Sequence, residues 1–255
     1  MTSRPAVKAT AGSHRSTTAR APKAQLTPPL SIIDACLDPE IFGPWFKDRL
    51  TWLAWIVFLR VMFGLGLDDA ELAIFRECTS RTAPRPGGYL EATLVVGRRG
   101  GKSLILALIA AFLSAFYDWS PYLTGGERGT IMIIATDRRQ ASTIFKYLRG
   151  MLGIPLLAGM IQRETSDTID LSNSITIEIQ TANFRTIRGR TVVAALADEL
   201  AFWMGDESKS GFRNHWGASA RNGDGPRGAD AKGVVALQPP RRVVERPPQA
   251  FWPGR

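Results

Sequence analysis

VVGRRGGKS, residues 95–103, joins two apolar runs of different length. The run before the turn, Ala92–Val96, has the length of a buried strand, and the run after it, Lys102–Tyr117, has the length of a helix. Glycines in the turn let the backbone approach a bound group closely, because they carry no Cβ. A helix N-terminus with free N–H groups and a lysine is suited to bind phosphate. The stretch therefore predicts a strand, a phosphate-binding loop and a helix.

We expect a nucleotide to bind to seven consecutive residues, Gly97, Arg98, Arg99, Gly100, Gly101, Lys102 and Ser103. Lys102 would bridge the β- and γ-phosphates of ATP, and the Ser103 hydroxyl would bind Mg²⁺. The strict pattern GxxxxGK[ST] has a glycine six residues before the lysine, where this chain has Val96. A chance Gly-Gly-Lys-Ser in an ordinary loop is the alternative interpretation, which the strand–turn–helix context disfavours.

An acidic pair follows another apolar run. Val192–Ala197 (VVAALA) ends in Asp198 and Glu199, 95 residues after Ser103. A buried strand would deliver Asp198 to the sheet edge as a ligand of Mg²⁺, and Glu199 would be the catalytic base that deprotonates the attacking water. A helix N-cap is the ordinary alternative for such a pair. Ligands of parallel sheets gather at the carboxyl ends of strands, where both motifs lie, and this favours ATP and Mg²⁺ as the bound cofactors.

Strands alternate with helices over residues 31–210, which we interpret as one domain. Further helices are predicted at 38–63, 68–78 and 137–148, a strand at 130–135, and a hairpin of strands 168–171 and 174–180 around Ser172-Asn173. Short apolar strands separated by helices are typical of a mostly parallel sheet covered on both faces. The expected fold class is therefore α/β, a P-loop NTPase with helices on both faces of the sheet and disordered ends.

The net charge of +9 belongs to the two ends of the chain. Residues 1–25 carry five Lys/Arg and no acid, and residues 211–255 carry eight Lys/Arg against three acids, which leaves the middle near −1. We predict a disordered basic arm over 1–30 and an irregular basic tail over 211–255, because both lack periodic apolar residues. The charge is weak evidence for a DNA groove on the central domain.

The run WLAWIVFLRVMFGLGL, residues 52–67, is apolar but short for a bilayer. Arg60 lies inside it, and a charge at a membrane centre costs about 2.5–3.5 kcal/mol. We therefore predict a buried helix and no membrane partner. The two cysteines, Cys36 and Cys78, are interpreted as reduced thiols of a cytosol-like compartment.

Four blocks resemble the ATPase half of bacteriophage terminase large subunits, in family order over residues 35–209. They are GRRGGKS (97–103), the lead-in DRLTWLAWIVFLRVMFGL (48–65) with DDAELAIFRECTSR (68–81), ATDRRQASTIFKYLRG (135–150) and FRTIRGRTVVAALADELAFW (184–203). The first, with Arg98 four residues before Lys102, is similar to the arginine-bearing Walker A variant of that family. The last is similar to its Walker B block, with Asp198 and Glu199.

The resemblance implies an ATPase that drives double-stranded viral DNA into a capsid, in the cytoplasm of a bacterial host. It implies a portal protein, a small terminase subunit and further copies of the chain as partners. Arg98 would then be a catalytic arginine that contacts the γ-phosphate or acts in trans. For the basic segment Arg185–Arg190, a solvated turn and a face toward DNA or phosphate both remain open.

Family members continue into a strand with an ATP-coupling motif and a nuclease domain, and residues 211–255 resemble neither, so we assign no nuclease activity. Read one nucleotide later, with synonymous codons chosen freely, part of the tail can encode SSPYSRRG, which is similar to the coupling-motif region. One hypothesis is therefore an out-of-frame tail on a truncated terminase. The alternatives are a nucleotide-binding fragment without turnover and another helicase-like P-loop ATPase.

Overall fold

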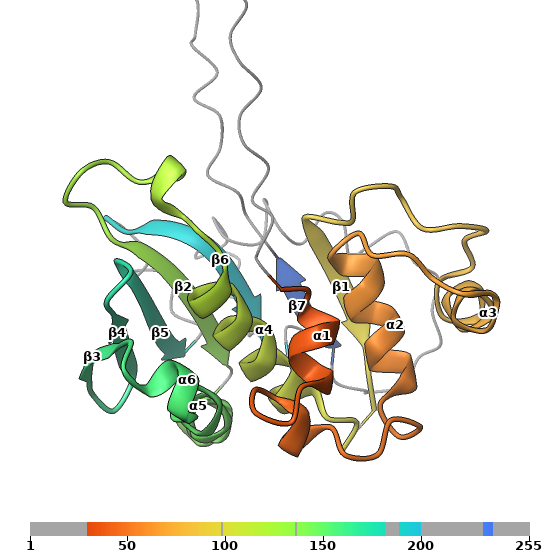
Figure 1. The fold of residues 1–255 in the computed structure, drawn as a ribbon, viewed down its shortest axis with the longest axis horizontal. Helices are drawn as coiled ribbons and strands as arrows, with labels where there is room; N and C mark the ends of the chain where they lie inside the picture. Colours follow the sequence, from red (N-terminus) through yellow and green to blue (C-terminus); the bar gives the residue numbers. More distant parts are fainter. Residues whose placement is uncertain (1–29, 98, 136, 182–188, 200–231, 237–255) are drawn as a thin grey trace, which may run out of the picture.

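The computed structural model describes residues 30–97, 99–135, 137–181, 189–199 and 232–236. Helices come first, strands and helices alternate over residues 91–158, and the elements described after residue 158 are strands (Figure 1). In chain order they are α1 (Ile32–Leu37), η1 (Gly43–Trp45), α2 (Leu53–Met62), α3 (Asp69–Thr79), β1 (Glu91–Val95), α4 (Lys102–Phe116), η2 (Ser120–Tyr122), β2 (Gly129–Ala135), α5 (Arg138–Leu152), α6 (Pro155–Ala158), β3 (Ile161–Glu164), β4 (Thr168–Leu171), β5 (Ile175–Thr181), β6 (Thr191–Ala197) and β7 (Lys232–Ala236).

The seven described strands form one sheet in the order β1-β7-β6-β2-β5-β4-β3. Strand β2 pairs in parallel with both β5 and β6, whereas β7 and β4 are antiparallel to their neighbours. Five of the seven strands therefore run in the same direction, and the protein is α/β with a mostly parallel open sheet. The carboxyl ends of β1, β6, β2 and β5 lie at the same edge.

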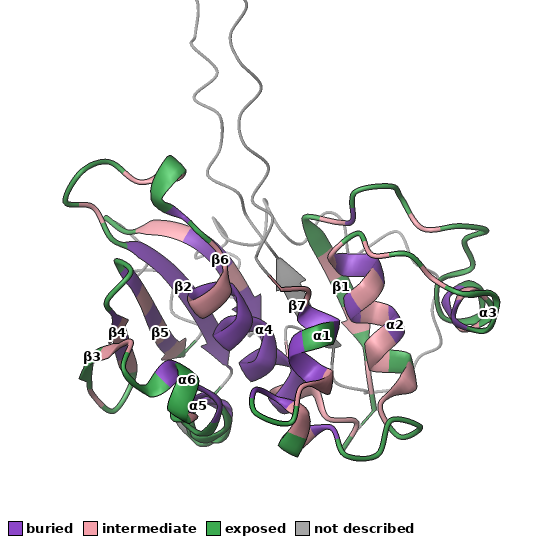
Figure 2. Ribbon diagram, viewed as in Figure 1, coloured by how far each residue is buried: buried purple, intermediate pink, exposed green. Residues whose placement is uncertain are grey.

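The core lies between the sheet and helix α4. All seven residues of β2 are buried, and so are eleven consecutive residues of α4, Leu104–Ser114 (Figure 2). A helix that is apolar on every side must be covered on every side. The sheet covers one side of α4, and aromatic residues from the N-terminal segments cover another, with Phe63 against Phe112 and Phe42 against Phe116.

Helices α4 and α5 contact each other, and both contact β2 and β5, so they lie side by side on the same face of the sheet. On β5, Ile175, Ile177 and Ile179 are buried, whereas the alternate residues are half-buried. We expected helices on both faces. In the described part of the chain, these two long helices between strands cover one face.

The apolar run at 52–67 forms the ten-residue helix α2, with Val57 and Leu59 in the core. Arg60 is accommodated because its Nε lies 3.0 Å from Oε1 of Glu71 in α3. Asp68 caps α3 in a capping box with Glu71. Within the described ranges, no helix combines the length and the apolar character needed to cross a membrane.

The largest difference from the sequence prediction is β7. We expected an irregular tail over 211–255, but Lys232–Ala236 lies between β1 and β6 and pairs with both. The predicted hairpin is present as β4 and β5, which pair antiparallel across Ser172-Asn173. The other residues of the tail, and residues 1–29 of the arm expected over 1–30, lie outside the described part.

Candidate functional site

Among the described residues of the loop between β1 and α4, two have a left-handed backbone conformation. Gly101 is the N-cap of α4 with φ +82°, and a Cβ there would lie 2.7 Å from Cζ3 of Trp52. Glycine is therefore required at 101 by both conformation and space. Arg99 is exposed with φ 59°, a conformation that non-glycine residues rarely adopt. Strain of this kind is concentrated at functional loops.

Val96 stands where the strict phosphate-loop pattern has glycine, and the structure explains why valine fits. A Cβ on Gly100 would lie 2.5 Å from Cγ1 of Val96, so the valine side chain occupies the space beside Gly100. The turn closes with a bond from the Gly100 N–H to the Gly97 carbonyl at 3.3 Å. Gly97 and Gly100 therefore lie together in one tight turn, while Arg98 lies outside the described residues.

Two tryptophans of the lead-in segment contact this loop, and the sequence did not predict either contact. The indole N–H of Trp55 donates to the carbonyl of Gly100 at 2.8 Å. Trp52, the N-cap of α2, lies against Gly101. Hydrophobicity alone predicts only that both lie in a buried apolar helix. Their only sequence signal is an indole donor in an otherwise apolar run, which needs a polar partner when it is buried.

Lys102 begins α4, and its side chain folds back over the loop. Its Nζ donates to the carbonyl of Val96 at 3.3 Å. Burial raises the pKa of Asp198, and the positive charge of Lys102 opposes that rise although 96 residues separate the two. The two motifs thus lie close enough for the charge of the lysine to act on the aspartate. Ser103 is half-buried in the first turn of α4, where the backbone N–H groups have no partners within the helix.

Asp198 follows the last residue of β6 and is 1% exposed. Its N–H donates to the Ile134 carbonyl at 2.8 Å, which continues the pairing of β6 with β2 by one residue. Burial raises the pKa of Asp198, the negative charge of Glu199 raises it further, and Lys102 opposes both. A buried carboxylate of this kind has a free-energy cost that a bound cation would offset.

Glu199 is half-buried with φ 51°, and its carboxylate has a partner from another element. The amide of Gln140, in the first turn of α5, donates from Nε2 to Oε1 of Glu199 at 2.6 Å. Asp137 places Gln140 there, because it caps α5 by accepting from the N–H groups of Arg139 and Gln140. Gln140 was not predicted as a site residue, since an isolated glutamine near a helix start carries no sequence signal.

The pairing register puts the two motifs at the same height on the sheet. Thr93 of β1 and Ala197 of β6 both pair with Val234 of β7. Val95 and Glu199 are each two residues further along, so the loop begins level with the acidic pair. Two strand spacings separate β1 from β6, a distance of about 10 Å. The site thus has loop N–H groups, a lysine, a hydroxyl and two carboxylates along one edge of the sheet.

The oxygen donors fit Mg²⁺. This cation takes oxygen ligands, and in nucleotide sites it keeps waters and substrate phosphates beside one or two protein ligands. The Ser103 hydroxyl and the Asp198 carboxylate are a donor set of this chemistry. Since these two residues follow β1 and β6 at the same edge, they are the residues that would hold the cation.

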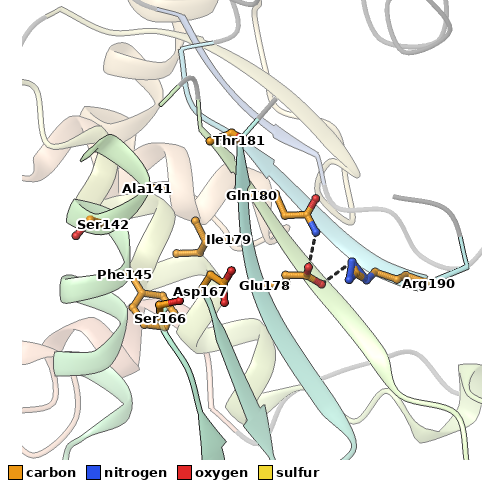
Figure 3. A pocket seen from close by; sticks show the side chains of 10 residues that line it. All are labelled: Ala141, Ser142, Phe145, Ser166, Asp167, Glu178, Ile179, Gln180, Thr181 and Arg190. Carbon is orange, nitrogen blue, oxygen red and sulfur yellow. Dashed lines mark hydrogen bonds and ion pairs between the residues drawn. The ribbon is translucent and has the colours of Figure 1, made fainter. Parts of the chain in front are cut away.

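A cavity of about 480 Å³ lies near the carboxyl end of β5, against the first half of α5 (Figure 3). Arg190, from the basic segment before β6, points into this region and pairs with Glu178 at 2.7 Å. Gln180 also donates to Glu178. The charge of Arg190 is therefore compensated within the domain, which favours a structural role for this arginine. The rest of the segment, 185–188, lies outside the described residues.

No protein-family model matches the chain, and a search of curated proteins found no significant relative.

Proposed function

We propose that the chain is a P-loop ATPase of the kind found in the motor half of phage terminase large subunits. The observation that carries the proposal is the placement of Lys102 and Asp198, since the segments that follow β1 and β6 lie level at the same edge of the sheet. Lysine after a glycine turn and aspartate after a buried strand are the two parts that ATP hydrolysis needs at one place. Support for the terminase class comes from the sequence blocks around both motifs.

In this proposal each residue has a separate task. The N–H groups of Gly101, Lys102 and Ser103 bind the phosphate oxygens, and the Lys102 ammonium neutralises charge at the β- and γ-phosphates. Bound Mg²⁺ would supply charge neutralisation between the phosphates. Glu199 accepts a proton from a water molecule, whose oxygen attacks the γ-phosphorus while the bond to the bridging β–γ oxygen breaks. ADP and inorganic phosphate are the products. Arg98 is the proposed arginine for the γ-phosphate.

Double-stranded DNA, a portal protein, a small terminase subunit and further copies of the chain are the proposed partners. This part of the proposal rests on the resemblance of the sequence blocks, and the proposed setting is the cytoplasm of a bacterial host.

The test compares MgATP binding and phosphate release in the parent and in Lys102→Ala. One lost charge-assisted contact is worth about 1.5–3 kcal/mol, so we expect roughly ten- to hundredfold weaker binding. Lys146→Ala is the control, because Lys146 is an exposed lysine on α5. Equal ATP affinity in the parent and in Lys102→Ala would exclude the phosphate loop. Tight binding without phosphate release in the parent would indicate a nucleotide-binding protein without turnover.

A further inference from the structure

The loop residue Gly100 is bonded to a residue 45 positions earlier in the chain. Trp55 Nε1 donates to the Gly100 carbonyl at 2.8 Å, a short and well-formed hydrogen bond. The ring of Trp55 is held in turn by Phe58, whose ring lies 5.8 Å away, edge-on. The donor is therefore a side chain of α2 whose ring is held in place by packing.

This bond fixes the orientation of one peptide plane. In a trans peptide the C=O and the following N–H point in opposite directions. Because the Gly100 carbonyl points at Trp55, the N–H of Gly101 points away from α2. That N–H precedes those of Lys102 and Ser103, which begin α4, and the three can address one anion together.

Two consecutive glycines would otherwise leave this plane free to rotate. Gly100 and Gly101 lack side chains, and glycine adopts positive and negative φ about equally well. A flipped plane would direct the Gly100 carbonyl, an acceptor, at the phosphate. Trp52 restricts the same segment from the side, since its ring lies where a Cβ of Gly101 would be.

We infer that Trp55 is a positioning residue of the phosphate site: its indole N–H holds the Gly100 carbonyl and so aims the Gly101 N–H at the phosphates of the nucleotide. This inference rests on the proposed function, because it assumes that the loop binds phosphate. It adds a role for α2, a helix that neither motif contains. It also restricts the role to the phosphate chain, so the base and the ribose are not involved.

The experiment measures the affinity of Trp55→Phe for MgATP, MgADP and magnesium pyrophosphate by calorimetry. Phenylalanine keeps most of the ring packing and removes the donor. We expect all three ligands to bind about three- to tenfold more weakly, by the same factor, as for the loss of one hydrogen bond.

The matched control is Trp119→Phe. The Trp119 N–H donates to the Leu113 carbonyl at 2.9 Å, toward the other end of α4, so the variant loses the same kind of bond away from the loop. It should lower the melting temperature and leave all three affinities unchanged.

Parent-like affinity in Trp55→Phe would overturn the inference and leave the proposed function standing. Equal losses of affinity in Trp55→Phe and Trp119→Phe would also overturn the inference, since they would reflect a loss of stability alone. A loss for ATP with none for pyrophosphate would assign Trp55 to the nucleoside and overturn the inference as well. A parent chain that binds none of the three ligands would refute both the proposed function and the inference.

Discussion

Gln140 donates a hydrogen bond from Nε2 to Oε1 of Glu199 at 2.6 Å, across 59 residues of sequence. The two lie at the carboxyl ends of adjacent strands, since Gln140 follows β2 and Glu199 follows β6. The other amide atom of Gln140, Oε1, is buried and has no hydrogen-bond partner among the described residues. Gln140 thus fixes the direction of the proposed catalytic base and keeps one acceptor available beside it.

Gln140→Ala should lower the turnover number for ATP by roughly tenfold, because the Glu199 carboxylate loses a charge-assisted bond. The KM for ATP should stay unchanged, since the hydrogen bond of Gln140 is to Glu199 and not to the phosphate loop. Steady-state kinetics with Gln162→Ala as the control checks this, because Gln162 is an exposed glutamine on β3. In a Glu199→Gln background the substitution should have no further effect, and an additive loss would show that Gln140 does not act through Glu199.

Glu199→Gln should keep MgATP affinity while it lowers turnover by roughly 10²–10⁴-fold, the usual contribution of a general base. The amide has the shape of the carboxylate but cannot accept the proton of the attacking water. Calorimetry gives the affinity, and phosphate release gives the rate. Unchanged hydrolysis would show that another group is the base.

Asp198→Asn should make the protein more stable near neutral pH while it weakens the binding of Mg²⁺. Burial and Glu199 raise the pKa of Asp198 above the ordinary value of 3.8, so the folded state binds this proton more tightly than the unfolded chain does. The free energy of unfolding therefore falls as the pH rises from the unfolded pKa to the folded pKa of Asp198. At a pH above the folded pKa, the buried carboxylate is ionised and its whole destabilising effect is present. Asparagine removes that cost.

The gain should accordingly disappear in acid, where the aspartate is neutral in both states. Urea unfolding of both proteins at about pH 7 and about pH 3 measures this. A gain that is the same at both pH values would show that the buried charge is not its source.

Cys36 and Cys78 should react with thiol reagents at very different rates. Cys36 is buried in α1, and burial raises its pKa to about 12, whereas Cys78 is exposed on α3. A thiol that is both covered and protonated is inert. We expect one thiol to be modified at once and the second only on unfolding, which mass spectrometry of the labelled peptides would show. Rapid labelling of Cys36 would contradict the packing of α1 against the core.

The sequence predicted the parts of this fold that local patterns encode. The strands at 92–96 and 130–135 and the helix after Lys102 were placed within a residue or two, because continuous apolar runs identify them. Asp198 and Lys102 were assigned to one site, since both follow strands at the same edge. Trp55 and Gln140 were missed because each role depends on a contact 45 or 59 residues away. Local periodicity carries no information about such contacts.

Strand β7 was missed for a different reason. Its sequence KGVVA holds two β-branched residues within a stretch rich in Gly, Pro and Arg, too few to indicate a strand by alternation. Position in the sheet determines its structure, because the edges of β1 and β6 offer unpaired N–H and C=O groups on both sides of it. A sequence pattern shows which residues of a segment are buried, but it does not show which unpaired strand edges the segment will pair with.

The place of β7 makes a prediction about two shortened chains, one that ends at residue 240 and one that ends at residue 210. The first keeps β7. The second lacks β7, which is the only described strand that joins β1 to β6. Several backbone hydrogen bonds would be lost at about 1 kcal/mol each, so the melting temperature of the second should fall by on the order of 10 °C. The chain ending at 240 should have the same melting temperature as the full-length protein.

Because β7 also sets the height of β1 relative to Asp198, the chain ending at 210 should lose MgATP affinity as well. Equal melting temperatures for all three chains would show that Lys232–Ala236 is no part of the cooperative unit, and that the tail is irregular as its composition predicted.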